Sequence, residues 1–289
     1  MKNNSSAEVK AFFDHDTYTV TYIVADCTEG VCAIIDPVLD YDPDSGRTHT
    51  KSADQVIDYI NEKNYRCQWI FETHVHADHL SSAPYLKSKV GGKTAIGNHV
   101  PDIQKTFGPI FNAGPEFAID GRQFDHLFDD NETFKIGTIE GNVFHTPGHT
   151  PACVSYVIGD CCFVGDTMFM PDFGTARCDF PGGDAAQLYD SIQRILSLPD
   201  DTILYMCHDY APGGREYKWV TSVKEQKEQN IHLAGKNRDE YIKARTERDA
   251  ELSMPKLILP SVQVNMRAGD FPPTDDNGVS YLKIPINML

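Results

Sequence analysis

Seven side chains that can bind a metal ion stand in four short segments of this 289-residue chain. Imidazole nitrogens and carboxylate oxygens supply the lone pairs that zinc and iron need. A single histidine or aspartate is more often an ordinary hydrogen-bonding residue, but a dense run of polar donors directly after an apolar segment makes a poor core. The sequence therefore predicts a metal site made from His74, His76, Asp78 and His79 in one run, together with His149, Asp166 and His208.

Each of these segments follows a predicted strand, which explains how donors far apart in sequence can meet. The strands are expected at about residues 68–71, 141–145, 161–164 and 202–207. Strand ends at one edge of a layered sheet converge on a shared cleft. The Pro147-Gly148 step predicts a tight turn immediately before His149.

The remaining histidines lack such a context. His145 is expected to pack beside the site or support it from behind, not to bind metal. The others are expected to be surface or structural residues: His15, His49, His99, His126 and His232.

Strands and helices alternate through two similar halves of the chain, which favours a layered α/β architecture. Period-2 and period-3.6 apolar patterns separate the two kinds of element. Residues 1–289 are interpreted as a single domain that includes a C-terminal helical and extended segment from about 216. The expected strands are 17–25, 31–38, 133–139 and 152–158; the expected helices are 53–63, 82–91, one after the capping Asp184, and helix-rich stretches at 216–233 and 237–252, with a Pro- and Gly-containing tail at 260–289.

Composition narrows the class of partner. The formal net charge of -16 argues against nucleic acid or an anionic membrane surface as a general partner. No apolar stretch is long enough to span a bilayer. Residues 1–6 show no apolar core of a secretion signal, so a cytoplasmic location is expected. The eight cysteines form no CxxC pair and mostly lie in apolar runs, which favours buried thiols over disulfides.

The order of the four segments resembles the metallo-β-lactamase superfamily. The resemblance rests on HxHxDH at 74–79, the HTPGHT histidine His149, the VGD aspartate Asp166 and the later His208, and it runs from about residue 17 to 208. It implies a four-layer αββα sandwich with the site at one edge. It also implies that Asp36, in an early Ile-Ile-Asp-Pro segment, supports the site from behind.

Other segments resemble the persulfide dioxygenase branch of this superfamily. They are residues 174–183, 207–210, 262–269 and 281–286. The branch implies one Fe(II) per chain, held by His74, His149 and Asp166, which oxidises glutathione persulfide with O2 to sulfite and glutathione. Tyr210 matches the branch's active-site tyrosine. A homodimer is also expected, because the branch is often dimeric.

A different activity stays open at this point. With Asp166 as a bridge, His76, Asp78, His79 and His208 would complete a two-metal site. Such a site generates a hydroxide nucleophile, as in a zinc hydrolase of thioesters, like glyoxalase II, or of lactones. One or two Zn(II) would then replace iron. A purely structural zinc site is disfavoured because it would need fewer donors.

Substrate contacts are predicted from charge. Glutathione carries carboxylates, so Arg177 and Arg267, which lie within the branch-like segments, are candidate substrate-binding residues. A structural ion pair or a solvated position is the alternative for each. Cys178 stands where the mitochondrial relatives carry threonine, and we expect it to be a packing residue.

Overall fold

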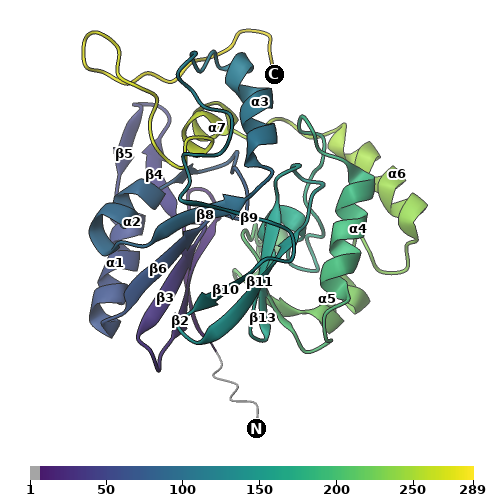
Figure 1. The fold of residues 1–289 in the computed structure, drawn as a ribbon. Helices are drawn as coiled ribbons and strands as arrows, with labels where there is room; N and C mark the ends of the chain where they lie inside the picture. The colour runs from purple at the N-terminus through teal and green to yellow at the C-terminus, as the bar shows by residue number, and fades with distance from the viewer. Residues whose placement is uncertain (1–6) are drawn as a thin grey trace.

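The computed structural model describes residues 7–289, and the expectation drawn from residues 1–6 lies outside this range. Two six-stranded sheets pack face to face (Figure 1). The first, in spatial order, contains β1 (Glu8–Phe13), β2 (Val20–Asp26), β3 (Val31–Ile35), β6 (Arg66–Phe71), β8 (Lys93–Gly97) and β9 (His126–Phe128). The second contains β10 (Thr133–Ile136), β11 (Ile139–His145), β12 (Val154–Ile158), β13 (Cys161–Phe163), β14 (Ile203–Tyr205) and β15 (Val220–Ser222). A small third sheet joins β5 (Arg47–His49), β4 (Val38–Asp42) and β7 (Leu80–Ser81).

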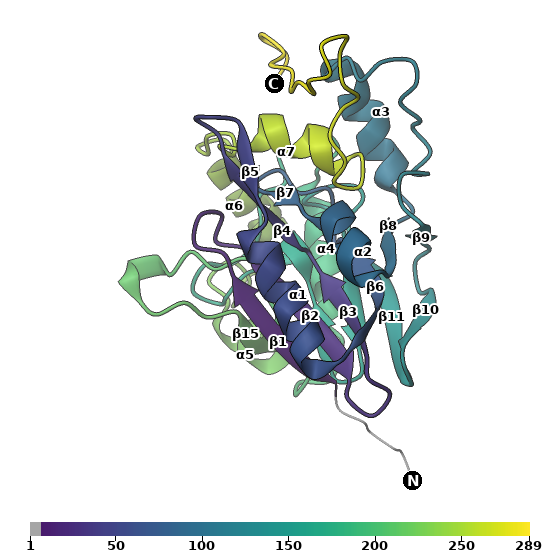
Figure 2. The same ribbon diagram turned by 90° about the vertical axis from the view of Figure 1, so that its left-hand side faces the viewer.

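Helices cover the outer faces of both large sheets. Helices α1 and α2 lie on the first sheet, and α4, α5 and α6 lie beside the second (Figures 1 and 2). The predicted four-layer αββα sandwich is therefore confirmed. The helices are α1 (Lys51–Lys63), α2 (Ala83–Val90), α3 (Val100–Ile110), α4 (Ala185–Leu196), α5 (Val223–Gln229), α6 (Arg238–Asp249) and α7 (Ile258–Asn265), with short 3-10 turns at Gly165–Thr167 and Pro212–Gly214.

Strand β2 shows why the inner layers form. Its side chains are buried on both faces: Tyr22 and Val24 point into the core between the sheets, whereas Ile23 packs toward α1. A strand covered on both faces reads as a nearly continuous apolar run, and residues 20–25 fit this pattern apart from Thr21. Burial of each large aliphatic side chain contributes about 1.5–3 kcal/mol.

Hydrogen bonds between the first residue of a strand in one sheet and a loop of the other join the two sheets at one edge. The Val154 N–H donates to the Thr73 carbonyl at 2.8 Å, and the Val20 N–H donates to the Cys207 carbonyl at 2.7 Å. Thr73 immediately precedes the histidine run, and Cys207 immediately precedes His208. The backbone itself therefore brings the predicted donor segments of both sheets together.

Two predictions about the second half were wrong. Residues 216–233 are not one helix-rich stretch: Val220–Ser222 form edge strand β15, which pairs with β14. The β-branched Val220 and Thr221 suit an edge strand, and the Ser222 hydroxyl then caps the short helix α5 by accepting from the Glu225 N–H. The tail also contains a helix that was not predicted, α7, most of whose side chains are buried.

Other expectations are confirmed. The Asp184 carboxylate caps α4 by accepting from the Gln187 N–H at 2.8 Å. All eight cysteines are free thiols, and only Cys27 is exposed. Over the described residues, no helix combines the length and apolar character that crossing a membrane requires.

Substitution of Gly148 tests how closely the loop that carries His149 packs against α4. Its φ is +136°, and an added Cβ would lie 2.3 Å from the backbone of Leu188 in α4. We expect Gly148→Ala to lower the free energy of unfolding by roughly 2–4 kcal/mol, from backbone strain and the clash together. Gly159→Ala is the matched control, because Gly159 also has a positive φ (+60°) but open space around it. It should cost only about 1–2 kcal/mol. Urea denaturation would measure both, and equal losses would contradict the close packing.

Candidate metal centre

The donors predicted from sequence meet at one edge of the sandwich as two sets. The first set is His74, His149 and Asp166; the second is His76, Asp78, His79 and His208. Within each set the ligand atoms lie within 4.8 Å of one another. Asp166 lies between the sets, because its Oδ2 is 3.7 Å from His149 Nε2 and its Oδ1 is 3.3 Å from His208 Nε2.

In the first set, the protein holds one nitrogen of each imidazole and leaves the other free. His149 Nδ1 lies 2.7 Å from the Arg177 carbonyl, so this nitrogen is the donor and Nε2 keeps its lone pair. His74 Nδ1 lies 3.0 Å from the Thr73 hydroxyl, which again leaves Nε2 available. Fixing the far nitrogen in this way orients a histidine for metal binding.

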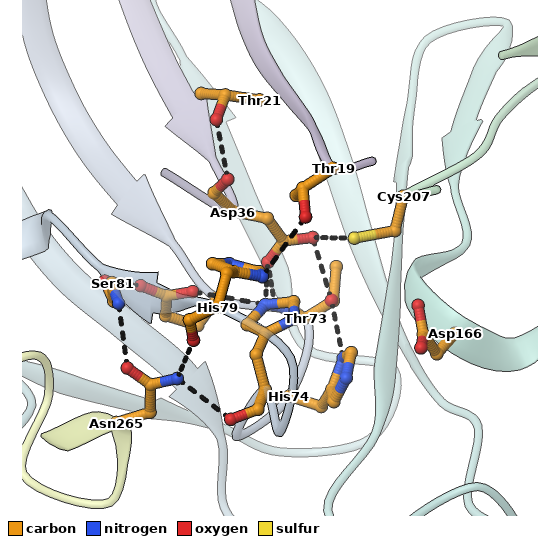
Figure 3. A network of polar contacts seen from close by, with 12 residues as sticks. Thr19, Thr21, Asp36, Thr73, His74, His79, Ser81, Asp166, Cys207 and Asn265 are labelled. Carbon is orange, nitrogen blue, oxygen red and sulfur yellow. Dashed lines mark hydrogen bonds and ion pairs between the residues drawn. The ribbon is translucent and has the colours of Figure 1, made fainter. Parts of the chain in front are cut away.

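In the second set the protein again holds one nitrogen of each imidazole, but in His76 the free nitrogen is Nδ1 instead of Nε2. His76 uses Nε2, 2.9 Å from Asp36 Oδ1, and leaves Nδ1 free. His79 and His208 both place Nδ1 3.3 Å from the Thr19 hydroxyl and leave Nε2 free. One threonine on the first sheet therefore orients two imidazoles (Figure 3 shows the contact to His79).

The free atoms are buried and have no hydrogen-bond partner within the protein. They are His76 Nδ1, His79 Nε2, His208 Nε2 and Asp166 Oδ1. A buried polar atom without a partner costs about 1–3 kcal/mol, and native proteins contain few of them. Three of these atoms belong to the second set, and His208 Nε2 lies 3.1 Å from Asp78 Oδ2 and 3.3 Å from Asp166 Oδ1. Such a group suits a cation, either a metal ion or a proton that His208 shares with the two carboxylates. Imidazole nitrogens with carboxylate oxygens fit a divalent transition-metal ion.

The electrostatics also favour a cation. Burial opposes a charge on His208, yet the Asp78 and Asp166 carboxylates raise the pKa of His208 to about 9. Burial, reinforced by the neighbouring histidines, lowers the pKa of His74 well below its ordinary value. His208 thus takes a proton to balance the carboxylates, whereas His74 stays a neutral ligand. Metal binding displaces such protons.

Asp36 lies behind the donors and contacts the loops that carry them. It accepts hydrogen bonds from the Thr73 N–H at 2.7 Å and the Thr73 hydroxyl at 2.9 Å, besides its contact with His76 (Figure 3). The Cys207 thiol, beside His208, also points toward it at 3.6 Å. One buried carboxylate therefore links the loops that carry His74, His76 and His208.

Gly165 explains how Asp166 reaches the centre. Its φ is +52°, and an added Cβ would lie 2.7 Å from the Thr73 hydroxyl. Only glycine lets the loop after β13 approach Thr73 this closely. The next residue, Asp166, then faces the donors of the first sheet.

Sequence reasoning missed two residues that contact this loop. Asn265, at the end of α7, accepts from the Ser81 N–H and donates to the carbonyls of His76 and His79 at 2.9 and 2.7 Å (Figure 3). Glu72 is buried, and burial raises its pKa. Its Oε2 lies 3.4 Å from His76 Nε2. The segment 262–269 was singled out for its resemblance to the dioxygenase branch, with Arg267 as the candidate residue, but its asparagine is the residue that contacts the loop.

A cavity of about 740 Å³ opens onto the first set. It is lined by His74, His149, Asp166 and Asp78, with aromatic walls of Phe169, Phe173, Phe180 and Tyr210. His76, His79 and His208 do not line it and have no exposed surface. The two sets therefore differ in access: a molecule in the cavity meets the first set, and the second lies behind it.

Of the two predicted substrate-binding residues, only Arg177 lines the cavity. Arg177 lines the cavity, but its guanidinium is engaged with both Asp179 oxygens and with the Ser253 carbonyl. Arg267 does not line the cavity; it lies over the Phe117 ring and donates to the Ala113 carbonyl. This placement gives Arg267 a packing role and does not support the prediction that it contacts substrate.

Tyr210 lies in the cavity wall near Asp78 and Asp166, and burial together with these carboxylates raises its pKa, so its hydroxyl keeps its proton.

Cys178 is buried, and its thiol donates to Asp249 at 3.2 Å. The expected packing role fits this position. His145 stacks on His99 and contacts the Pro151 carbonyl, away from the donor sets.

The sequence model of the Metallo-beta-lactamase superfamily matches residues 16–208, which span every donor described above. The chain belongs to the metallo-β-lactamase superfamily. It is 55% identical to a probable metallo-hydrolase of Burkholderia pseudomallei, over 97% of this chain and 99% of that protein. It is 51% identical to glyoxylase B2 of Dictyostelium discoideum, over 99% of each.

Relatives named ETHE1 are less similar in sequence to this chain. The mitochondrial persulfide dioxygenase ETHE1 of Homo sapiens is 28% identical, over 92% of this chain and 90% of that protein. The crystal structure of ETHE1 from Myxococcus xanthus superposes with a TM-score of 0.73 at 30% identity, covering 91% of this chain and all of that one. Names from both hydrolase and dioxygenase chemistry thus occur among the relatives.

Asp36→Asn tests the support from behind. The amide keeps the shape but presents an N–H where Asp36 accepts from Thr73 and His76. We expect metal affinity to fall roughly 10–100-fold, the usual effect of losing such a carboxylate. Competition with a chelator would measure it, and circular dichroism would verify the fold. Unchanged affinity in a folded variant would contradict the role given to Asp36.

Proposed function

We propose that the protein is an iron(II)-dependent persulfide dioxygenase that oxidises glutathione persulfide with O2 to sulfite and glutathione. The main support for this proposal is that the cavity reaches every member of only one donor set, which is His74, His149 and Asp166. Two histidines and one carboxylate on one face, with open positions opposite, are the arrangement of non-haem Fe(II) oxygenases. Bound there, ferrous iron would supply the positions at which the persulfide sulfur and O2 meet.

The side chains that line the cavity suit this reaction. Phe169, Phe173 and Phe180 exclude water from the cavity side of the donor set. Tyr210 keeps its phenolic proton and is placed to donate a hydrogen bond to a reacting oxygen or sulfur atom. We assign Tyr210 this orienting role.

Cations at the cavity rim suit a substrate with carboxylates. Arg248 and Lys256 line the cavity, are exposed, and form no ion pair or side-chain hydrogen bond among the described residues. Arg177 is already paired with Asp179. We therefore propose Arg248 and Lys256, in place of Arg267, as the residues that bind the carboxylates of glutathione.

A dinuclear zinc hydrolase is the second candidate. The observation in its favour is the completeness of the second set, with Asp166 placed to bridge the two. The hydrolase-like names of the more similar relatives agree with it. In that enzyme the pair of metal ions would lower the pKa of bound water.

The two candidates differ in metal content and in the role of Asp78. Protein loaded anaerobically is expected to bind about one iron per chain in the mononuclear arrangement. It should take up O2 with glutathione persulfide and release sulfite. Asp78→Ala should spare most of this O2 uptake, because Asp78 belongs to the second set. Two zinc ions per chain, rapid thioester hydrolysis that Asp78→Ala abolishes, and no O2 uptake would establish the hydrolase instead.

Arg248→Ala tests the substrate-binding proposal. An exposed ion pair contributes up to about 1 kcal/mol, so KM for glutathione persulfide should rise roughly fivefold with little change in kcat. Lys243→Ala is the matched control, because Lys243 is an exposed cation on the same helix that does not line the cavity. Steady-state O2 uptake would measure both. An unchanged KM for Arg248→Ala would contradict the assignment.

A further inference from the structure

Three tyrosines follow one another from the wall of the cavity that holds His74, His149 and Asp166 to a position outside that cavity. The Tyr210 ring lies nearly parallel to the His208 imidazole, with 6.0 Å between centroids. Tyr18 follows at 5.7 Å from Tyr210, and Tyr217 follows at 6.3 Å from Tyr18. Phe13 then lies 4.4 Å from Tyr217. The phenol rings thus form a continuous series with short gaps.

All three rings are partly exposed to solvent, and the last one lies outside the cavity. Tyr210, Tyr18 and Tyr217 expose 36%, 39% and 37% of their surface, although all are large and mostly apolar. Tyr210 and Tyr18 line the cavity, whereas Tyr217 lies outside it. A small molecule in solution can therefore reach Tyr217 without entering the cavity.

Tyr18 occupies a strained backbone conformation that places it in the series. Its φ is +59°, which is uncommon for a residue with a bulky side chain. Two backbone hydrogen bonds hold this turn: the Asp14 N–H donates to the Thr19 carbonyl, and the Asp209 N–H donates to the Tyr18 carbonyl. Strain of this kind persists where the surrounding structure fixes it, and it often marks a functional position.

A simple apolar wall would account for the rings but not for their chemistry. Phenylalanine also lines this cavity at Phe169 and Phe173, although both are less exposed than the three tyrosines. Phenols differ from phenyl rings in that they lose one electron and one proton readily. Three phenols in succession beside a metal centre therefore suggest a path for electrons.

We propose that Tyr210, Tyr18 and Tyr217 carry oxidising equivalents away from the metal centre when O2 reacts there without persulfide. This inference rests on the proposed dioxygenase function, since it needs an oxidant formed from O2 and ferrous iron. The path protects the buried histidine and cysteine side chains, which are otherwise the nearest oxidisable groups.

The electron balance is as follows. Tyr210 gives one electron to the oxidant and releases its phenolic proton to solvent in the cavity, which leaves a neutral tyrosyl radical. Tyr18 then reduces Tyr210, and Tyr217 reduces Tyr18; each phenol regains a proton as it is reduced. A soluble thiol gives a hydrogen atom to the Tyr217 radical, and two thiyl radicals combine to a disulfide. Each passage thus consumes one oxidising equivalent and one thiol.

The experiment uses the full-length, iron-loaded protein and hydrogen peroxide as the oxidant, so that it does not depend on persulfide turnover. Freeze-quench electron paramagnetic resonance should show a tyrosyl radical that glutathione removes. Mass spectrometry should find oxidation products at Tyr217. In Tyr217→Phe the radical should stop at Tyr18, and oxidation should shift to Tyr18 and to residues of the metal centre, while O2 uptake with persulfide is unchanged. Tyr18→Phe should abolish oxidation of Tyr217.

Tyr281→Phe is the control, because Tyr281 is an exposed tyrosine outside the series. Unaltered oxidation of Tyr217 in Tyr18→Phe would overturn the path. Absence of O2 uptake with persulfide, together with a peroxide-dependent radical at Tyr217, would instead remove the proposed function and leave the path standing.

Discussion

The structure depends on one repeated interaction: each of the five donor histidines is held by one ring nitrogen and presents the other to a common centre. The holding groups are the Arg177 carbonyl, the hydroxyls of Thr19 and Thr73, and the Asp36 carboxylate. These groups lie outside the HxHxDH run, although Asp78 of the run also contacts His79 Nδ1 at 3.2 Å. The motif supplies lone pairs, but its surroundings decide which lone pair is free and where it points.

The sandwich fold brings these holding groups together at one edge. Thr19 and Asp36 flank strands β2 and β3 of the first sheet, and Thr73 lies just after β6 of the same sheet, whereas Arg177 lies in the loop between β13 of the second sheet and α4. Backbone hydrogen bonds between the sheets, such as Val154 to Thr73, fix the edge at which they meet. Access then separates two otherwise similar donor sets, because the cavity reaches only one set in full. This difference supports a mononuclear oxygenase more strongly than the identity of the donors does.

The spaced motif and the alternation of elements allowed the donors and a layered α/β architecture to be predicted, whereas the αββα sandwich and the position of Asp36 were predicted from the resemblance to the superfamily. Asn265 and Arg248 could not be found in this way, since their roles arise where α7 and α6 return to the site. Arg267 illustrates the same difficulty: its segment does approach the centre, yet the arginine turns to Phe117. Residues 220–222 were misread because the charged segment around them suggested helix, whereas the β-branched Val220 and Thr221 pair with β14, a long-range contact.

The central claim is that a single metal ion sits among His74, His149 and Asp166. Anomalous X-ray diffraction at the iron edge, from crystals of anaerobically iron-loaded protein, tests it most directly. The account predicts one strong peak within bonding distance of His74 Nε2, His149 Nε2 and an Asp166 oxygen, with no comparable peak among His76, Asp78, His79 and His208. Two peaks of similar height on either side of Asp166 would contradict it.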